Sequence, residues 1–206
     1  MDPLRRSLVI ALAAAPLAAR AQARPQFTEL KPPQPVETAA GKIEVIEFFW
    51  YGCPHCYSLE PVLESWAKKL PADVQLRLVP AVFNDRWGYD AAIYYAFDAL
   101  GVLDRVHSAF FDAIHRDHLR SDNTAALSEW LQKQGIDPKK FGEVFKSFGV
   151  QSKTKRATQQ TLAYKIDGTP AMAVQGRYTV SAEQGRTQQG LLQTVDYLVD
   201  LVRKQK

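Results

Sequence analysis

The chain has 206 residues, of which 46% are hydrophobic and 23% charged, and a formal net charge of +4. This length is enough for one domain with a substantial core. Lysine and arginine are scattered, and the one basic cluster, residues 153–156, is expected to form the solvated first turn of a helix. These features exclude a basic nucleic-acid-binding stripe.

Residues 1–23 have the layout of a secretory signal peptide. Arg5 and Arg6 precede an apolar run at residues 8–17, and small residues ending at Ala23 mark a cleavage site. The run is shorter than the roughly 20 residues that a membrane span needs. We therefore predict export to the periplasm, by either the general secretory or the twin-arginine route.

The first predicted elements of the mature chain are strands around one helix. Residues 27–30 form a short strand candidate, and residues 43–50 a central strand rich in β-branched and aromatic residues. Helical spacing follows up to residue 70, and residues 74–79 form a second long strand. One helix between two strands predicts that the strands are parallel.

The next part of the chain, residues 87–149, has helical patterns throughout and is predicted to be an all-helical insertion. Asp137 followed by Pro138 is typical of a helix start. Ser152 is expected to begin a longer helix that ends before Gly168.

The C-terminal part contains two alternating strands, residues 171–174 and 178–180, and a last amphipathic helix. The order of elements predicts an α/β fold with a mixed central sheet and a large all-helical insertion. In this interpretation residues 24–86 and 150–206 are the two parts of one domain, and residues 87–149 interrupt it.

The only cysteines of the chain, Cys53 and Cys56, flank Pro54 and His55 where the central strand turns into the helix. We expect Cys53 at the N-cap and Pro54 at the first helical position, with the next backbone N–H groups pointing at the Cys53 sulfur. The helix dipole and the His55 side chain add to this effect, so the pKa of Cys53 is predicted to be lowered. A stabilised thiolate makes the disulfide an oxidant.

Other uses of the cysteine pair remain open. A structural clip would close too small a loop to contribute much stability. A metal site with His115 and His118 has a tighter histidine spacing than usual, and these two are more simply a solvated helix end, so we predict no metal. His107 has no sequence companion that indicates chemistry. A reductase, an isomerase or a chaperone-like binding module are the remaining alternatives.

Three motifs, residues 47–49, 53–57 and 168–171, together resemble the DsbA branch of the thioredoxin-like disulfide oxidoreductases. The resemblance spans nearly the whole mature chain and includes the helical insertion and the export signal. It implies a thioredoxin-like fold.

The resemblance also implies roles for single residues. Cys53 is the reactive cysteine and Cys56 its partner, while Pro54 and His55 tune the potential. Residues 169–170, Thr-Pro, form a loop with a cis peptide bond that faces the disulfide and pairs with an extended substrate.

Two acids and one aromatic residue complete the implied site. Glu47 resembles a buried acid that affects proton movement at the deeper cysteine, although a carboxylate paired at a sheet end fits equally well. Glu60 resembles a second acid, but the strand at residues 74–79 lacks the lysine expected as its charge partner. Tyr51, nearest the disulfide, is expected to be exposed and to contact substrates.

The function implied is that of a monomeric thiol:disulfide oxidase. It would donate its disulfide to unfolded or newly exported cysteine-containing proteins, with no cofactor besides that disulfide. A DsbB-type membrane quinone oxidoreductase would reoxidise it.

Overall fold

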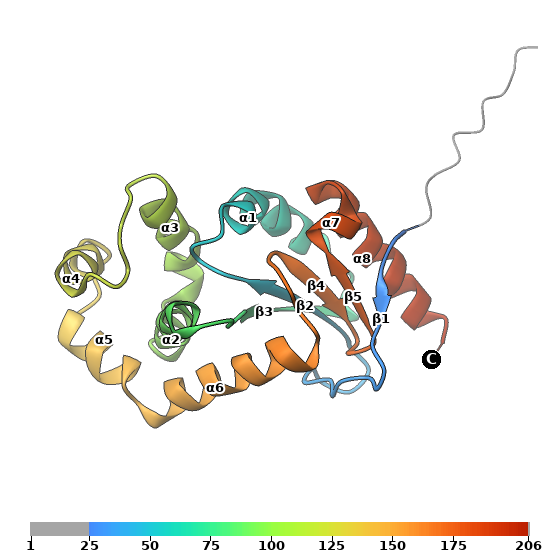
Figure 1. The fold of residues 1–206 in the computed structure, drawn as a ribbon, viewed down its shortest axis with the longest axis horizontal. Coiled ribbons are helices and arrows are strands. Elements are labelled where there is room, and N and C mark those ends of the chain that lie inside the picture. Colours follow the sequence, from blue (N-terminus) through green and yellow to red (C-terminus); the bar gives the residue numbers. More distant parts are fainter. Residues whose placement is uncertain (1–24, 206) are drawn as a thin grey trace, which may run out of the picture.

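A computed structural model describes residues 25–205 of the chain (Figure 1). The predicted signal peptide lies outside these described residues. Five strands form a single sheet in the order β1-β5-β4-β2-β3. Within the described part of the chain, no helix has the length and apolar character needed to cross a membrane.

The sheet is mixed, as predicted. β2 (Ile43–Phe49) runs parallel to β3 (Val74–Pro80) and antiparallel to β4 (Ala171–Val174). β5 (Tyr178–Ser181) pairs antiparallel with β4 and with the short β1 (Thr28–Glu29). Every residue of β2 is buried, and five of its seven residues are apolar or aromatic, as a strand covered on both faces requires. The other two are the buried acids Glu44 and Glu47.

Eight helices accompany the sheet in the described residues: α1 (Pro54–Ala67), α2 (Asp85–Ala99), α3 (Leu103–His115), α4 (Thr124–Lys133), α5 (Pro138–Phe145), α6 (Phe148–Ala163), α7 (Ala182–Gly185) and α8 (Gln188–Arg203). Figure 1 shows α1 and α8 on one side of the sheet, α6 along the other, and α2 to α5 gathered at one end.

Alternate residues of β2 enter different cores. Ile43 and Val45 pack with residues of α1 and α8, whereas Ile46 and Phe48 pack with Ala157 of α6. This two-residue period is what a strand covered on both faces requires. Phe49, at the end of the strand, joins a third core made by the helices α2 to α6.

The predicted start of α6 at Ser152 is wrong. The helix begins at Phe148, because the Ser147 hydroxyl accepts a hydrogen bond from the Val150 backbone N–H at 3.3 Å. The basic residues 153–156 therefore lie inside α6 rather than in its first turn. The division into residues 24–86, 87–149 and 150–206 stays a prediction, and α6 spans its second boundary.

Candidate active site

Cys53 is the N-cap residue of α1, as predicted. Pro54 occupies the first turn, where its missing N–H costs nothing. The Cys56 backbone N–H donates a hydrogen bond to the Cys53 sulfur over 3.4 Å. Both cysteines are free thiols in this structure, with Cys53 6% and Cys56 1% exposed.

The environment separates the two thiols in acidity. A hydrogen bond with the Cys56 side chain lowers the pKa of Cys53 to about 5; burial opposes this, and hydrogen bonds from Thr169 and from the backbone N–H groups of Cys56 and His55 assist it. Burial, followed by the hydrogen bond with Cys53, raises the pKa of Cys56 well above its ordinary value. Cys53 is therefore the thiolate of the pair, and Cys56 keeps its proton.

The Thr169-Pro170 loop lies against the reactive sulfur. Its peptide bond is cis, and the Cys53 sulfur lies 3.3 Å from the Thr169 carbonyl oxygen, to which it donates a hydrogen bond when it is protonated. A cavity of about 330 Å³ adjoins this loop, and His55, Pro170 and Leu191 are among its lining residues. The two sequence motifs thus meet at one surface.

His55 is exposed, and the structure links it to the Cys53 sulfur through its backbone N–H. Its imidazole lines the cavity beside Pro170. The tuning role of the side chain stays a prediction.

The expectation that Tyr51 is exposed is wrong. Its side chain is 1% exposed, and its hydroxyl lies 2.8 Å from Nδ1 of His107. The ring packs edge-on against Phe110 and Phe111 of α3. Tyr51 faces the helical insertion because α3 lies over the segment between β2 and α1, so the structure does not support a substrate contact.

Glu47 is buried on β2 beneath the cysteines. Burial raises the pKa of its carboxyl well above the ordinary value, and the charges of Glu60 and Cys53 add to the shift. Glu47 in turn raises the pKa of Cys56. The Glu47 carboxyl therefore holds its proton more tightly than an exposed carboxyl, and its role in proton movement at Cys56 stays a prediction.

His107 is a residue whose surroundings sequence reasoning missed. Nε2 of its ring lies 3.6 Å from Glu60 Oε2, and the Ser108 hydroxyl donates to Glu60 over 3.1 Å. Burial opposes ionisation of Glu60, but His107 and Ser108 outweigh it and lower the pKa of that carboxyl. The apolar stripe of α3 is a sequence signal that His107 is buried. Its pairing with Glu60 has no such signal, because it depends on how α1 packs against α3.

His115, a member of the rival metal set, has other contacts. Its Nε2 lies 2.8 Å from the Tyr51 carbonyl oxygen, and its ring stacks on Tyr57 with centroids 4.7 Å apart. It is half-buried, so the expectation of a solvated helix end is wrong for His115, while His118 is exposed. Among the described residues, no group of three or more histidine, cysteine, aspartate or glutamate side chains is arranged to hold a metal ion.

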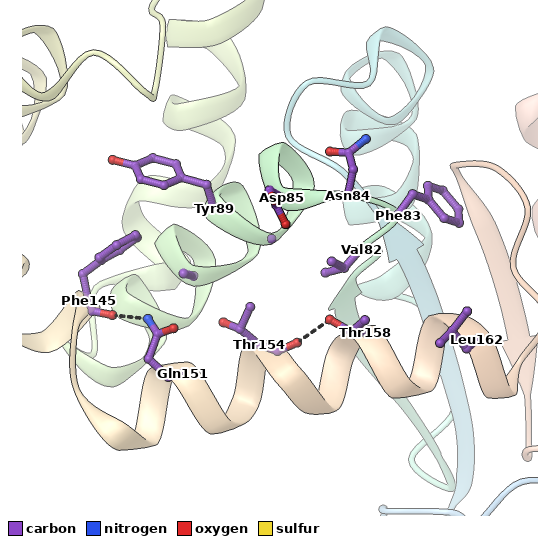
Figure 2. Close-up of a pocket in the computed structure, with 12 residues that line it drawn as sticks. Val82, Phe83, Asn84, Asp85, Tyr89, Phe145, Gln151, Thr154, Thr158 and Leu162 are labelled. Atoms are coloured by element: carbon purple, nitrogen blue, oxygen red, sulfur yellow. Dashed lines mark hydrogen bonds between the residues drawn. The ribbon is translucent and has the colours of Figure 1, made fainter.

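A second groove, of about 680 Å³, lies between α2 and α6 (Figure 2). Phe83 and Tyr89 line one side of it, and Thr158 and Leu162 the other. The described residues that line this groove include neither cysteine, so it is separate from the redox pair.

The fold and the paired cysteines define a thioredoxin-like disulfide oxidoreductase. The family of the DSBA-like thioredoxin domain matches residues 89–193, which include the Thr169-Pro170 loop and begin after the cysteine motif. The chain belongs to the DsbA family of thiol:disulfide interchange proteins.

Individual relatives cover almost the whole chain. The thiol:disulfide interchange protein DsbA of Burkholderia cepacia is 39% identical over 211 residues, with 100% of both chains covered. That of Bordetella parapertussis is 45% identical over 202 residues and covers 94% of this chain and 96% of its own. The resemblance seen in the sequence is thus confirmed.

Solved structures agree with these relatives. The crystal structure of Pseudomonas aeruginosa DsbA has a TM-score of 0.81 at 36% identity, covering 86% of this chain and 92% of that one. The oxidoreductase DsbA from Xylella fastidiosa has a TM-score of 0.80 at 35% identity, covering 86% and 95%.

Proposed function

We propose that this disulfide oxidoreductase works as an oxidant, donating the Cys53–Cys56 disulfide to other proteins. The observation that carries the proposal is the Cys53 sulfur at the N-terminus of α1, whose pKa is lowered to about 5. Each pH unit by which a thiol pKa lies below the ambient pH stabilises the dithiol state by about 1.4 kcal/mol, or about 30 mV in a two-electron couple. The reduced form is therefore favoured, and electrons flow from substrate thiols to this pair.

The reaction proceeds in two exchanges. A substrate thiolate attacks the Cys53 sulfur, the bond to Cys56 breaks, and Cys56 leaves and takes up a proton. A second substrate thiolate then attacks the substrate sulfur of the mixed disulfide and expels Cys53 as a thiolate. Two substrate thiols become one disulfide, and the two electrons remain on the two cysteine sulfurs of this protein.

The surroundings of the pair support distinct roles for the neighbouring residues. Pro54 and His55 set the start of α1 and so tune the potential, and Glu47 exchanges the proton of Cys56. The Thr169 backbone would pair with an extended substrate, which the direct continuation of Pro170 into β4 supports. The cavity beside Pro170 would take an apolar substrate side chain next to the reacting cysteine.

The substrates we propose are unfolded or newly exported cysteine-containing proteins in the periplasm. The leader-like residues 1–23 and the family of the chain support this location. A DsbB-type membrane quinone oxidoreductase would restore the disulfide, and the protein would act as a monomer.

The redox equilibrium of the purified protein with glutathione tests the direction of transfer. A midpoint potential above about −200 mV supports the oxidase, because reductases of the thioredoxin type lie at about −270 mV. A value at the thioredoxin end would instead support a reductase.

Trapping of the mixed disulfide tests the reacting atom. A Cys56→Ala variant mixed with an unfolded, oxidised protein should accumulate a covalent adduct through Cys53, and the matched Cys53→Ala variant should not. Full activity of a chain that lacks both cysteines would point to a chaperone-like binding module.

A further inference from the structure

One side chain of the helical insertion contacts both flanks of the cysteine motif. His115, at the end of α3, places Nε2 2.8 Å from the carbonyl oxygen of Tyr51, two residues before Cys53. Its ring also stacks on Tyr57, the residue after Cys56, with an interplanar angle of 7°. The segment that carries both cysteines is therefore held at its two ends by the same imidazole.

The contact with Tyr51 is a hydrogen bond that the imidazole donates. A carbonyl oxygen only accepts, so the proton of this bond belongs to Nε2 of His115. Tyr51 is buried, and its carbonyl therefore depends on a protein donor rather than on water. Tyr57 is fixed as well, because its hydroxyl donates to Oδ1 of Asp112, one turn earlier on α3, over 2.7 Å. The helix α3 thus restrains the backbone before the motif and the side chain after it.

The restrained segment contains the groups that stabilise the reactive sulfur. The Cys53 backbone N–H donates to the Trp50 carbonyl over 3.0 Å, and the Cys56 backbone N–H donates to the Cys53 sulfur over 3.4 Å. The second bond depends on the conformation of Cys53 as the N-cap of α1, with φ at −86° and ψ at 116°. Tyr51 and Gly52 lie inside the turn that the first bond closes. A displacement of the Tyr51 carbonyl therefore changes where the Cys53 sulfur lies relative to α1.

We propose that His115 is a positioning residue of the redox reaction, whose hydrogen bond to the Tyr51 carbonyl holds the N-cap at Cys53 in the conformation that favours the dithiol state. This inference rests on the redox function proposed above. The Cys53 thiolate gains from the aligned N–H groups of α1, whereas the disulfide carries no charge on its sulfurs and gains little from them. Loss of the hydrogen bond should therefore destabilise the dithiol more than the disulfide and make the protein a weaker oxidant.

A packing role of His115 has a different consequence. If the imidazole only filled space between α3 and the cysteine segment, its loss would destabilise the dithiol and the disulfide forms equally. The redox equilibrium reports the difference in free energy between these two folded forms, so an equal loss does not move it. The equilibrium with glutathione therefore separates positioning from packing.

Three substitutions of His115 separate the hydrogen bond from the ring. His115→Phe keeps an aromatic ring beside Tyr57 but has no N–H for the Tyr51 carbonyl. His115→Gln has no ring, but its amide N–H reaches about as far as Nε2 of the imidazole. His115→Asn carries the same amide on a side chain that is one methylene group shorter, out of reach of the carbonyl. The equilibrium constant with glutathione is measured at pH 7 for each variant and for the wild type.

Arg105→Ala is the matched control on the same helix. Nη1 of Arg105 donates to the backbone carbonyl oxygen of Gln134 over 2.7 Å. This substitution also removes a hydrogen bond from an α3 side chain to a backbone carbonyl, but it does so at the end of α4 rather than beside the cysteine motif.

We expect His115→Phe and His115→Asn to be less oxidising than the wild type by about three- to tenfold in the equilibrium constant, as the loss of one hydrogen bond implies. His115→Gln and Arg105→Ala should stay within about twofold of the wild type. Thiolate absorbance should show a higher pKa of Cys53 in His115→Phe and His115→Asn than in the wild type.

Wild-type equilibrium constants in His115→Phe and His115→Asn, or an equally large loss in His115→Gln, would reduce His115 to a packing residue. The Phe and Asn variants differ in bulk, so either one carries the test if the other does not fold. The potential of the wild type tests the oxidase separately, whereas the variants are compared with the wild type, so the two proposals fail independently.

Discussion

The sulfur of Cys53 lies 3.3 Å from the carbonyl oxygen of Thr169, which is 116 residues further along the chain. The sheet brings them together: β2 leads into the cysteine motif, β4 starts after Pro170, and the two strands are antiparallel neighbours. In this register Phe48, near the end of β2, pairs with Ala171, the first residue of β4. A substrate that reaches the sulfur therefore meets the Thr169-Pro170 loop as well.

The stability of the reduced protein should depend on pH through Cys53. The folded pKa of this thiol is about 5, below its ordinary value near 8.5, so its stabilising effect is fully present above the ordinary value and is lost as the pH falls towards 5. The gain in the free energy of unfolding is at most about 1.4 kcal/mol per pH unit, and solvent screening of the partly accessible sulfur lowers it. The disulfide form has no ionisable sulfur and serves as the control.

Urea unfolding of both forms at pH 5 and pH 7.5 measures this difference. The free energy of unfolding of the dithiol form, relative to the disulfide form, should be larger at pH 7.5. A difference that is the same at both values would show that the thiolate is not stabilised by folding.

His55→Ala should raise the pKa of Cys53 and make the pair less oxidising, because it removes an imidazole next to the thiolate. The side chain is exposed, and the backbone N–H remains in the variant, so we expect a rise of about one pKa unit, or about 30 mV. Thiolate absorbance during a pH titration reports the shift. If the pKa of Cys53 did not change in His55→Ala, the His55 side chain would have no part in lowering it.

Local signals in the sequence predicted the parts of the site that are built locally. The N-cap at Cys53 and the helix start at Asp137 depend on a few consecutive residues, and the structure contains both. Ser152 failed as a start because Ser147 is an equally good cap and precedes Val150, whose side chain is buried in the helical core.

Contacts between distant elements were not predictable in the same way. The motif places Tyr51 beside the disulfide, but the direction of its side chain follows from the position of α3. The pairing of Glu60 with His107 joins α1 and α3 and has no fixed spacing in sequence. The sequence analysis looked for the charge partner of Glu60 on β3 and expected a lysine there, whereas the partner is His107 on α3.

Glu47→Gln should stabilise the protein at neutral pH. The folded pKa of Glu47 is raised, so the carboxyl costs stability once the pH exceeds its unfolded value near 4.3, and this cost is absent below about pH 4. We expect a gain of about 1–3 kcal/mol at pH 7 in the free energy of unfolding. Because Glu47 is proposed to exchange the proton of Cys56, a slower departure of Cys56 when the mixed disulfide forms at Cys53 should accompany it.

Glu44→Gln is the matched control on the same strand. The buried Glu44 carboxylate binds Nε of Arg77 at 3.0 Å and accepts the Glu37 backbone N–H at 2.9 Å. Removing the Glu44 charge leaves Arg77 with Glu37, whose Oε2 lies 3.2 Å from Nη1, in place of two carboxylates, so this variant should lose stability. Loss of stability in both variants would mean that Glu47 is also held by a compensating charge.

Gly52→Ala should disturb the segment that precedes the reactive cysteine. A Cβ atom at Gly52 would overlap the Trp50 indole, whose N–H donates to Asp90 over 2.8 Å and whose ring stacks on Trp87 with centroids 4.2 Å apart. Displacing the indole should cost about 1–3 kcal/mol in the free energy of unfolding. Because the Cys53 backbone N–H donates to the Trp50 carbonyl over 3.0 Å, the potential should change too.

Tryptophan fluorescence and urea unfolding follow both effects, and Gly142→Ala is the control. A Cβ at this helical position in α5 has open space around it, so the substitution should stabilise the protein by about 0.5–1 kcal/mol through helix propensity alone. The glutathione equilibrium should then stay at the wild-type value. If Gly52→Ala also left stability and potential unchanged, the close packing of Trp50 against the cysteine segment would have no part in setting the site.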